Sequence, residues 1–335
     1  MQRKLSCVAA CAYAVTVFGV VTSGHAQSIH ATRVVAFDDR GQLGGGNFDP
    51  SLALGPMGGG GHVHSLGRGG FLTLGFAVTI VDGPGADLIV GENPFGSTTE
   101  PWKSFAEVAF VEVSSNGTDF ARFPARYTGP QVQPGPFDFL DSGAYGNLTG
   151  RFVVNASAAD PQDVVDAGGD AFDLADLAND PLVLGGQVDL NAITEVRIVD
   201  AESGVATDTR GVTIYDTGGV GSADIDGVTV IQHAGNQSPN APRVDLTIPA
   251  DGRFSLTISD PDGLTDLDPA SLRAALWGNE LAFGALLDVS GITQVTNTSF
   301  TMELLAPLPP GILLAMQVSV KDRAGHRSGA SRTRP

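Results

Sequence analysis

Apolar residues alternate along residues 71–80 in a way that leaves little choice of secondary structure. The side chains at every second position are Leu72, Leu74, Phe76, Val78 and Ile80. A period of two places these side chains on one face of an extended chain, whereas a helix would scatter them around its axis. The segment therefore predicts a β-strand with one face turned toward a core.

Other short segments read in the same way and are separated by glycine and proline. Strand-like runs occur at 86–90, 106–114, 120–123, 193–200, 211–216, 225–232, 244–248, 254–258, 300–305 and 312–320. A single helical turn is expected around 172–177, and one or two turns at 269–277. The chain also has 44 glycines. Many short strands with such punctuation predict an all-β protein: a jelly-roll-like antiparallel sandwich followed by a smaller Ig-like β-sandwich.

The start of the chain has the pattern of a secretory signal peptide. Arg3 and Lys4 precede an apolar run over residues 5–21, and Gly24-His25-Ala26 is a small-x-small cleavage site. We therefore expect residues 1–26 to be removed and the protein to be extracellular, on the cell surface or periplasmic. Both cysteines, Cys7 and Cys11, would leave with that peptide, so the mature chain would have no disulfide.

The remaining sequence divides at a polar segment that contains two prolines. We expect a jelly-roll-like domain over residues 27–234, a linker over 235–242 and an Ig-like domain over 243–335. The formal net charge is -18, and loss of the signal peptide would make it more negative still. Such a field repels nucleic acid and anionic lipid and attracts divalent cations, and no integral membrane segment is expected after cleavage.

Acidic turns suggest a calcium ion that stabilises the larger domain. Three carboxylates fall within seven residues at Asp170, Asp173 and Asp176, and Asp224 and Asp226 repeat the pattern near a later strand. Calcium takes six to eight oxygen ligands from carboxylates and turn carbonyls. In the alternative interpretation Asp170 or Asp173 caps the helical turn and the others face water, because aspartate favours caps and turns.

A loop that follows a buried strand is the expected ligand-binding face. It contains Glu92, Asn93, Phe95 and Trp102. Aromatic rings on sandwich loops stack on sugars, and neighbouring polar groups bond to hydroxyls. Glu92 could instead pair with a second carboxylate, such as Glu107 or Glu112, to hydrolyse a glycosidic bond.

Four segments of the larger domain form a distinctive set: SLGRGGFLTLGF at 65–76, VDGPGADLIVGENPF at 81–95, FAEVAFVEVS at 105–114 and GGDAFDLAD at 168–176. In this order they resemble a family of secreted bacterial cell-surface proteins of unknown function. The resemblance implies a surface location and supplies no catalytic residues. One departure is Gly91, where a bulky apolar residue is expected. Residues 240–330 resemble bacterial Ig-like or cadherin-like modules through DPDG at 260–263 and KDRAG at 321–325.

Together these features predict a secreted, non-catalytic binding protein that is stabilised by calcium. Carbohydrate or another surface polymer is the expected ligand. Two alternatives stay open: a glycan-active hydrolase that uses Glu92, and a purely structural component of a surface or matrix.

Overall fold

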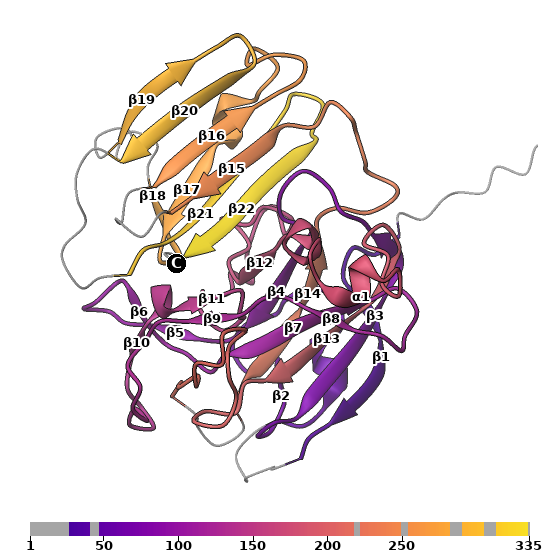
Figure 1. Ribbon diagram of the computed structural model, residues 1–335, viewed down its shortest axis with the longest axis vertical. Helices are drawn as coiled ribbons and strands as arrows, with labels where there is room; N and C mark the ends of the chain where they lie inside the picture. The colour runs from indigo at the N-terminus through magenta and orange to yellow at the C-terminus, as the bar shows by residue number, and fades with distance from the viewer. Residues whose placement is uncertain are drawn as a thin grey trace, which may run out of the picture.

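The computed structural model describes residues 27–40, 47–217, 222–248, 254–281, 290–304 and 313–333. The expected signal peptide at residues 1–26 lies outside the described residues. Antiparallel sheets dominate the described part, which confirms the prediction of an all-β sandwich protein. Strands up to residue 230 pair with one another, and strands from residue 243 onward pair with one another (Figure 1).

Two sheets form the first sandwich. The five-stranded sheet has the order β1 (Ala31–Asp38), β3 (Phe71–Ile80), β13 (Ile193–Asp200), β7 (Ala109–Ser114) and β8 (Ala121–Arg122). The four-stranded sheet has the order β12 (Asp170–Phe172), β4 (Leu88–Glu92), β14 (Asp224–Val230) and β2 (His64–Ser65).

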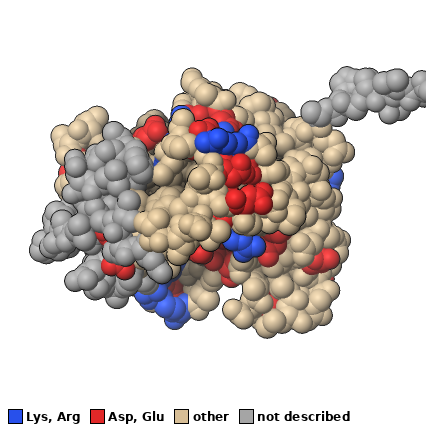
Figure 2. All heavy atoms as spheres, turned by 90° about the horizontal axis from the view of Figure 1, so that it is seen from above, with Lys and Arg blue, Asp and Glu red and all other residues tan. Residues whose placement is uncertain are grey.

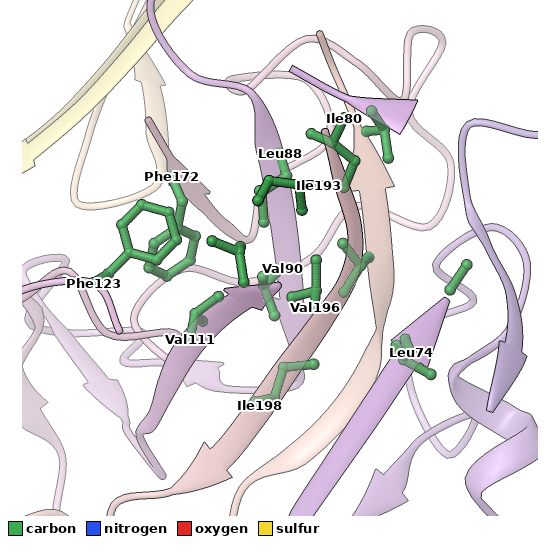
Figure 3. Close-up of a cluster of buried hydrophobic side chains, with 14 of the residues drawn as sticks. Leu74, Ile80, Leu88, Val90, Val111, Phe123, Phe172, Ile193, Val196 and Ile198 are labelled. Atoms are coloured by element: carbon green, nitrogen blue, oxygen red, sulfur yellow. The ribbon is translucent and has the colours of Figure 1, made fainter. Parts of the chain in front are cut away.

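The apolar core of the first sandwich lies between these sheets. Leu74 and Val196 come from one sheet and Leu88 and Val90 from the other, and Phe123 packs on Phe172 with ring centroids 5.0 Å apart (Figure 3). Strand β3 spans the residues expected from the alternation, and its alternate side chains enter this core. The period of two is therefore explained by burial of one face against the opposite sheet.

The first sandwich also contains two small sheets and four short helical turns among its described residues. The small sheets are β10 (Leu140–Asp141), β6 (Lys103–Phe105) and β5 (Phe95–Gly96), and β11 (Tyr145–Gly146) with β9 (Arg126–Tyr127). The helical turns are η1 (Pro50–Ala53), η2 (Ser142–Ala144), η3 (Leu174–Leu177) and α1 (Pro181–Leu184).

The second sandwich has two four-stranded sheets. One has the order β15 (Arg243–Thr247), β16 (Ser255–Ser259), β20 (Ser299–Leu304) and β19 (Ser290–Val295). The other has the order β18 (Asn279–Leu281), β17 (Arg273–Leu276), β21 (Ala315–Lys321) and β22 (Arg327–Thr333). The turn η4 (Pro269–Ser271) precedes β17.

One expectation about secondary structure was confirmed only in part, and another was wrong. Residues 269–277 form one short 3₁₀ turn and then strand β17, which pairs with β21. Residues 211–216 form a tight loop with a single bridge between Thr207 and Thr213. In that loop, Asp208 accepts hydrogen bonds from the backbone N–H groups of Arg210 and Val212 at 2.8 and 2.9 Å. A carboxylate that captures these donors favours a turn over a sheet ladder.

Strand β22 of the second sandwich packs against the first, beside β12 and β11. The backbones approach closely at Gly85, where the Ala86 N–H donates to the Gly329 carbonyl at 2.8 Å. A Cβ at Gly85 would lie 2.4 Å from that oxygen, and the φ angle of +82° also favours glycine. Trp102 and Trp277 meet at the same boundary with ring centroids 6.4 Å apart. The two sandwiches thus share a packed interface.

Charged groups also cross the interface. The Asp160 carboxylate pairs with Arg327 at 2.9 Å and with Lys321.

Figure 2 shows Asp and Glu side chains gathered in a band on the face seen from above, with Lys and Arg side chains next to them. On this face the acidic side chains are therefore grouped rather than evenly spread.

Candidate functional site

Asp170 forms a buried ion pair. Its Oδ1 accepts from Arg151 Nε at 2.7 Å, and its Oδ2 accepts from the backbone N–H groups of Gly150 and Arg151 at 2.8 and 3.0 Å. Burial raises the pKa of Asp170, and the Arg151 charge opposes that rise. The predicted calcium ligand therefore already has a cationic partner.

Asp173 caps the turn η3, as the alternative interpretation expects. Its side chain accepts from the Ala175 N–H at 3.0 Å. Arg332, on β22, lies 3.5 Å from Asp173 and 3.4 Å from Asp176. Burial and the neighbouring Asp176 charge raise the pKa of Asp173 to about 6. The second sandwich therefore supplies a positive charge to both carboxylates.

Asp224 and Asp226 attach neighbouring segments to β14 in the first sandwich. Asp224 accepts from the Ser65 hydroxyl. Asp226 accepts from the N–H groups of Gly58 and Gly59, both at 2.7 Å. These bonds explain why two carboxylates alternate along the beginning of β14.

The five predicted calcium ligands do not lie together in one group. Among the described residues, Asp173 lies within 4.8 Å of Asp82 and Asp87, measured between carboxylate oxygens. Asp87 already accepts from the Gly83 and Leu174 N–H groups at 2.8 and 2.6 Å. Asp82 and Asp87 belong to a turn that the sequence did not mark as a metal site. Calcium binding in the first sandwich stays a prediction.

Glu92 is enclosed by protein rather than open to a substrate. Glu92 is only 1% exposed, and its Oε1 accepts a hydrogen bond from the Asp224 N–H at 3.1 Å. Its Oε2 has no hydrogen-bond partner among the described residues. Burial, and then the Glu107 charge, raise the pKa of Glu92 well above its usual range.

This environment bears on the hydrolase alternative. Glu112 is ion-paired with Arg122 at 2.6 Å and with Arg197 at 2.5 Å. Glu107, like Glu92, is buried. A glycosidase needs both carboxyl groups beside the scissile bond, and a sugar cannot reach a side chain as enclosed as Glu92. The arrangement therefore favours a structural role for Glu92.

The other expected ligand-binding residues separate into two groups. Asn93 donates to the Gly60 carbonyl at 2.8 Å and holds a loop. Trp102 contacts Trp277 of the second sandwich and so forms part of the interface. Phe95 is 61% exposed and packs at an angle on Phe105, with ring centroids 6.2 Å apart. Phe95 alone of these residues presents most of its side chain to solvent.

An open trough lies next to Phe95, at the small sheet formed by β5, β6 and β10. Its volume is about 590 Å³. Two exposed phenylalanines line it, Phe137 (82% exposed) and Phe139 (39%). The polar side of the trough is formed by Ser97, Thr98, Thr99, Glu100, Lys103 and Asp138. Exposed aromatic rings and hydroxyl-binding groups thus lie side by side.

Sequence reasoning missed the two phenylalanines of the trough. They belong to the segment Pro134-Gly-Pro-Phe-Asp-Phe139, which joins β9 to β10. The available signal was a pair of aromatics within a proline- and glycine-rich loop, where no strand could bury them. Lys103 and Glu100 form an ion pair at 2.8 Å across the polar side of the trough.

The comparisons with known proteins add no family to this description. No family model matches the chain, and no curated protein matches it. The resemblance to secreted cell-surface proteins therefore stays a prediction. The helices in the described part of the chain are short, and none of them could span a lipid bilayer.

Proposed function

We propose that this chain is a secreted, non-catalytic binding protein whose trough beside β5, β6 and β10 holds a carbohydrate polymer. The observation that supports the proposal most directly is the exposure of Phe137, at 82%, beside hydroxyl and charged side chains. Large apolar side chains that gather at the surface mark binding sites more often than isolated ones do.

The chemistry of the trough matches a sugar ring. The apolar face of a pyranose can stack on Phe137 or Phe139, which removes both surfaces from water. The hydroxyls of Ser97, Thr98 and Thr99 and the charged groups of Glu100, Lys103 and Asp138 can bond to the sugar hydroxyls. An open trough suits one stretch of a long polymer better than a small molecule that must be enclosed.

The expected secretion fits this ligand. A signal peptide would place the protein outside the cytoplasm, where cell-wall, capsular and matrix polysaccharides occur. The net charge of -18 disfavours strongly anionic polymers, so a neutral or weakly charged polysaccharide is the expected class.

A polysaccharide array tests the proposal directly. We expect the native protein to be retained on one or more neutral polysaccharides and Phe137→Ala to bind at least about tenfold more weakly, because loss of one stacked ring removes about 1.5 kcal/mol. Leu184→Ala is the matched control, since Leu184 is 70% exposed on α1, outside the trough.

Three outcomes would contradict the proposal. Equal binding by the native protein and Phe137→Ala would show that the polysaccharide binds outside the trough. Release of reducing sugar from a bound polysaccharide would show an enzyme, and failure to bind any polysaccharide would favour the structural alternative.

A further inference from the structure

Three carboxylates of the second sandwich converge between two of its loops. Asp260 directly follows β16, Asp266 lies six residues further on, and Asp322 directly follows β21. One carboxylate oxygen from each lies within 4.8 Å of the other two. Backbone bonds fix this arrangement: Asp260 N–H donates to the Thr298 carbonyl at 2.9 Å, and Leu267 bridges to Asp322.

One carboxylate oxygen of Asp260 is buried without a hydrogen-bond partner among the described residues. The residue is fully buried, and its Oδ1 accepts from the Asp262 N–H at 2.8 Å. Its Oδ2 is buried with no hydrogen-bond partner among the described residues. A buried carboxylate oxygen without a donor or a cation is costly, so native proteins rarely leave one in that state.

The neighbouring charges increase that cost. Burial, and the like charges of Asp266 and Asp322, raise the pKa of Asp260. His326 partly offsets the negative charge of Asp322. The backbone N–H of His326 donates to Asp322 Oδ1 at 2.8 Å, and its ring Nδ1 lies 2.6 Å from Oδ2. No lysine or arginine of the described ranges forms an ion pair with any of the three carboxylates.

We propose that Asp260, Asp266 and Asp322 bind one calcium ion. Oxygen atoms around a single calcium ion, each 2.3–2.6 Å from it, lie at most about 5 Å from one another, which the observed spacing satisfies. Carboxylate ligands favour a hard cation such as calcium. The ion would supply the missing partner of Asp260 Oδ2.

The position of the site gives calcium a mechanical role. The ion would join the loop after β16 to the loop between β21 and β22. Strand β22 also packs against the first sandwich and brings Arg332 to Asp173 and Asp176. Calcium in the second sandwich would thus stabilise β22, the strand through which the second sandwich packs against the first. This role is independent of carbohydrate binding in the trough.

Calorimetric titration of the EDTA-treated full chain with CaCl₂ tests the site. We expect the native chain to bind calcium with a Kd in the range of about 10⁻⁴–10⁻³ M that extracellular modules show. Asp260→Asn and Asp266→Asn should each abolish that binding. Asp245→Asn, on an exposed position of β15, should retain it.

Folding of each variant is checked by near-ultraviolet circular dichroism without calcium, since asparagine preserves the size of aspartate. Two variants are used because Asp266 is only half-buried, so its replacement disturbs the fold less than that of Asp260. Absence of calcium binding by the native chain would overturn the proposal. So would unchanged binding by folded Asp260→Asn and Asp266→Asn, or loss of binding in Asp245→Asn alone.

Discussion

Replacement of Arg151 by methionine tests the role assigned to the Asp170 segment. In the native chain Arg151 is 3% exposed and Asp170 is fully buried, with Arg151 Nε 2.7 Å from Asp170 Oδ1. Methionine keeps the apolar stem beside Phe152, over which the guanidinium lies 4.9 Å from the ring centroid. The substitution therefore removes the charge and little of the packing.

The expected loss of stability follows from the unpaired carboxylate that remains. Breaking a buried ion pair from one side costs about 3–5 kcal/mol. The lower end of that range is expected, because the N–H groups of residues 150 and 151 still donate to Asp170 Oδ2. The Tyr145 carbonyl also loses its bond from Arg151, which is 2.9 Å long.

The effect of Arg151→Met depends on pH in a defined direction. Burial already raises the pKa of Asp170, and loss of the arginine charge raises it further. A carboxyl whose pKa is raised in the folded state stabilises folding below its ordinary pKa, and that contribution is lost as the pH rises through the folded value. The variant should therefore be more destabilised at pH 8 than at pH 5.

Urea unfolding followed by tryptophan fluorescence measures the change. The two tryptophans of the chain, Trp102 and Trp277, contact each other across the interface, so one signal reports both folding and docking of the sandwiches. Arg151→Met combined with Asp170→Asn should recover about 2 kcal/mol, because no charge is left buried. A loss below about 1 kcal/mol that does not vary with pH would refute the assignment.

Two further variants probe other carboxylates. Glu92→Gln should raise the urea midpoint at pH 8, because burial and the Glu107 charge raise the pKa of Glu92 and make its ionised form unfavourable in the folded chain. Polysaccharide retention by this variant should not change. If Glu92 were catalytic, the variant would lose activity. Asp160→Asn should lower stability by about 1 kcal/mol at pH 7. Although burial opposes it, pairing with Lys321 and Arg327 lowers the pKa of Asp160. Its contribution should therefore be present above pH ~4 and disappear as the pH falls, which urea midpoints across that range would show.

The strands of the core could be predicted because burial leaves a local pattern in the sequence. Strands β3 and β13 span the expected residues 71–80 and 193–200. Strand β1 was not identified, because it is an edge strand and most of its side chains face solvent. Its sequence has no apolar alternation for the same reason.

The candidate site could be predicted only in part because its partners are distant in sequence. Phe95 was identified and is exposed, whereas Trp102 is occupied by Trp277, 175 positions further along. Phe137 lies at the trough because β10, which follows it in the chain, pairs with β6. Pairing of this kind depends on tertiary structure, which residue spacing does not encode.

The acidic segments show the same limit in electrostatic terms. GGDAFDLAD and DPDG resemble each other as sequence, since both place aspartates on turns beside glycine. In the folded chain, Arg151 and Arg332 neutralise the carboxylates of the first segment. Asp322, which lies with Asp260 and Asp266, is instead paired with His326, whose ring is charged only when protonated. The difference between an ion-paired turn and a cation site therefore depends on which strand packs beside it, and β22 brings Arg332 to the first segment alone.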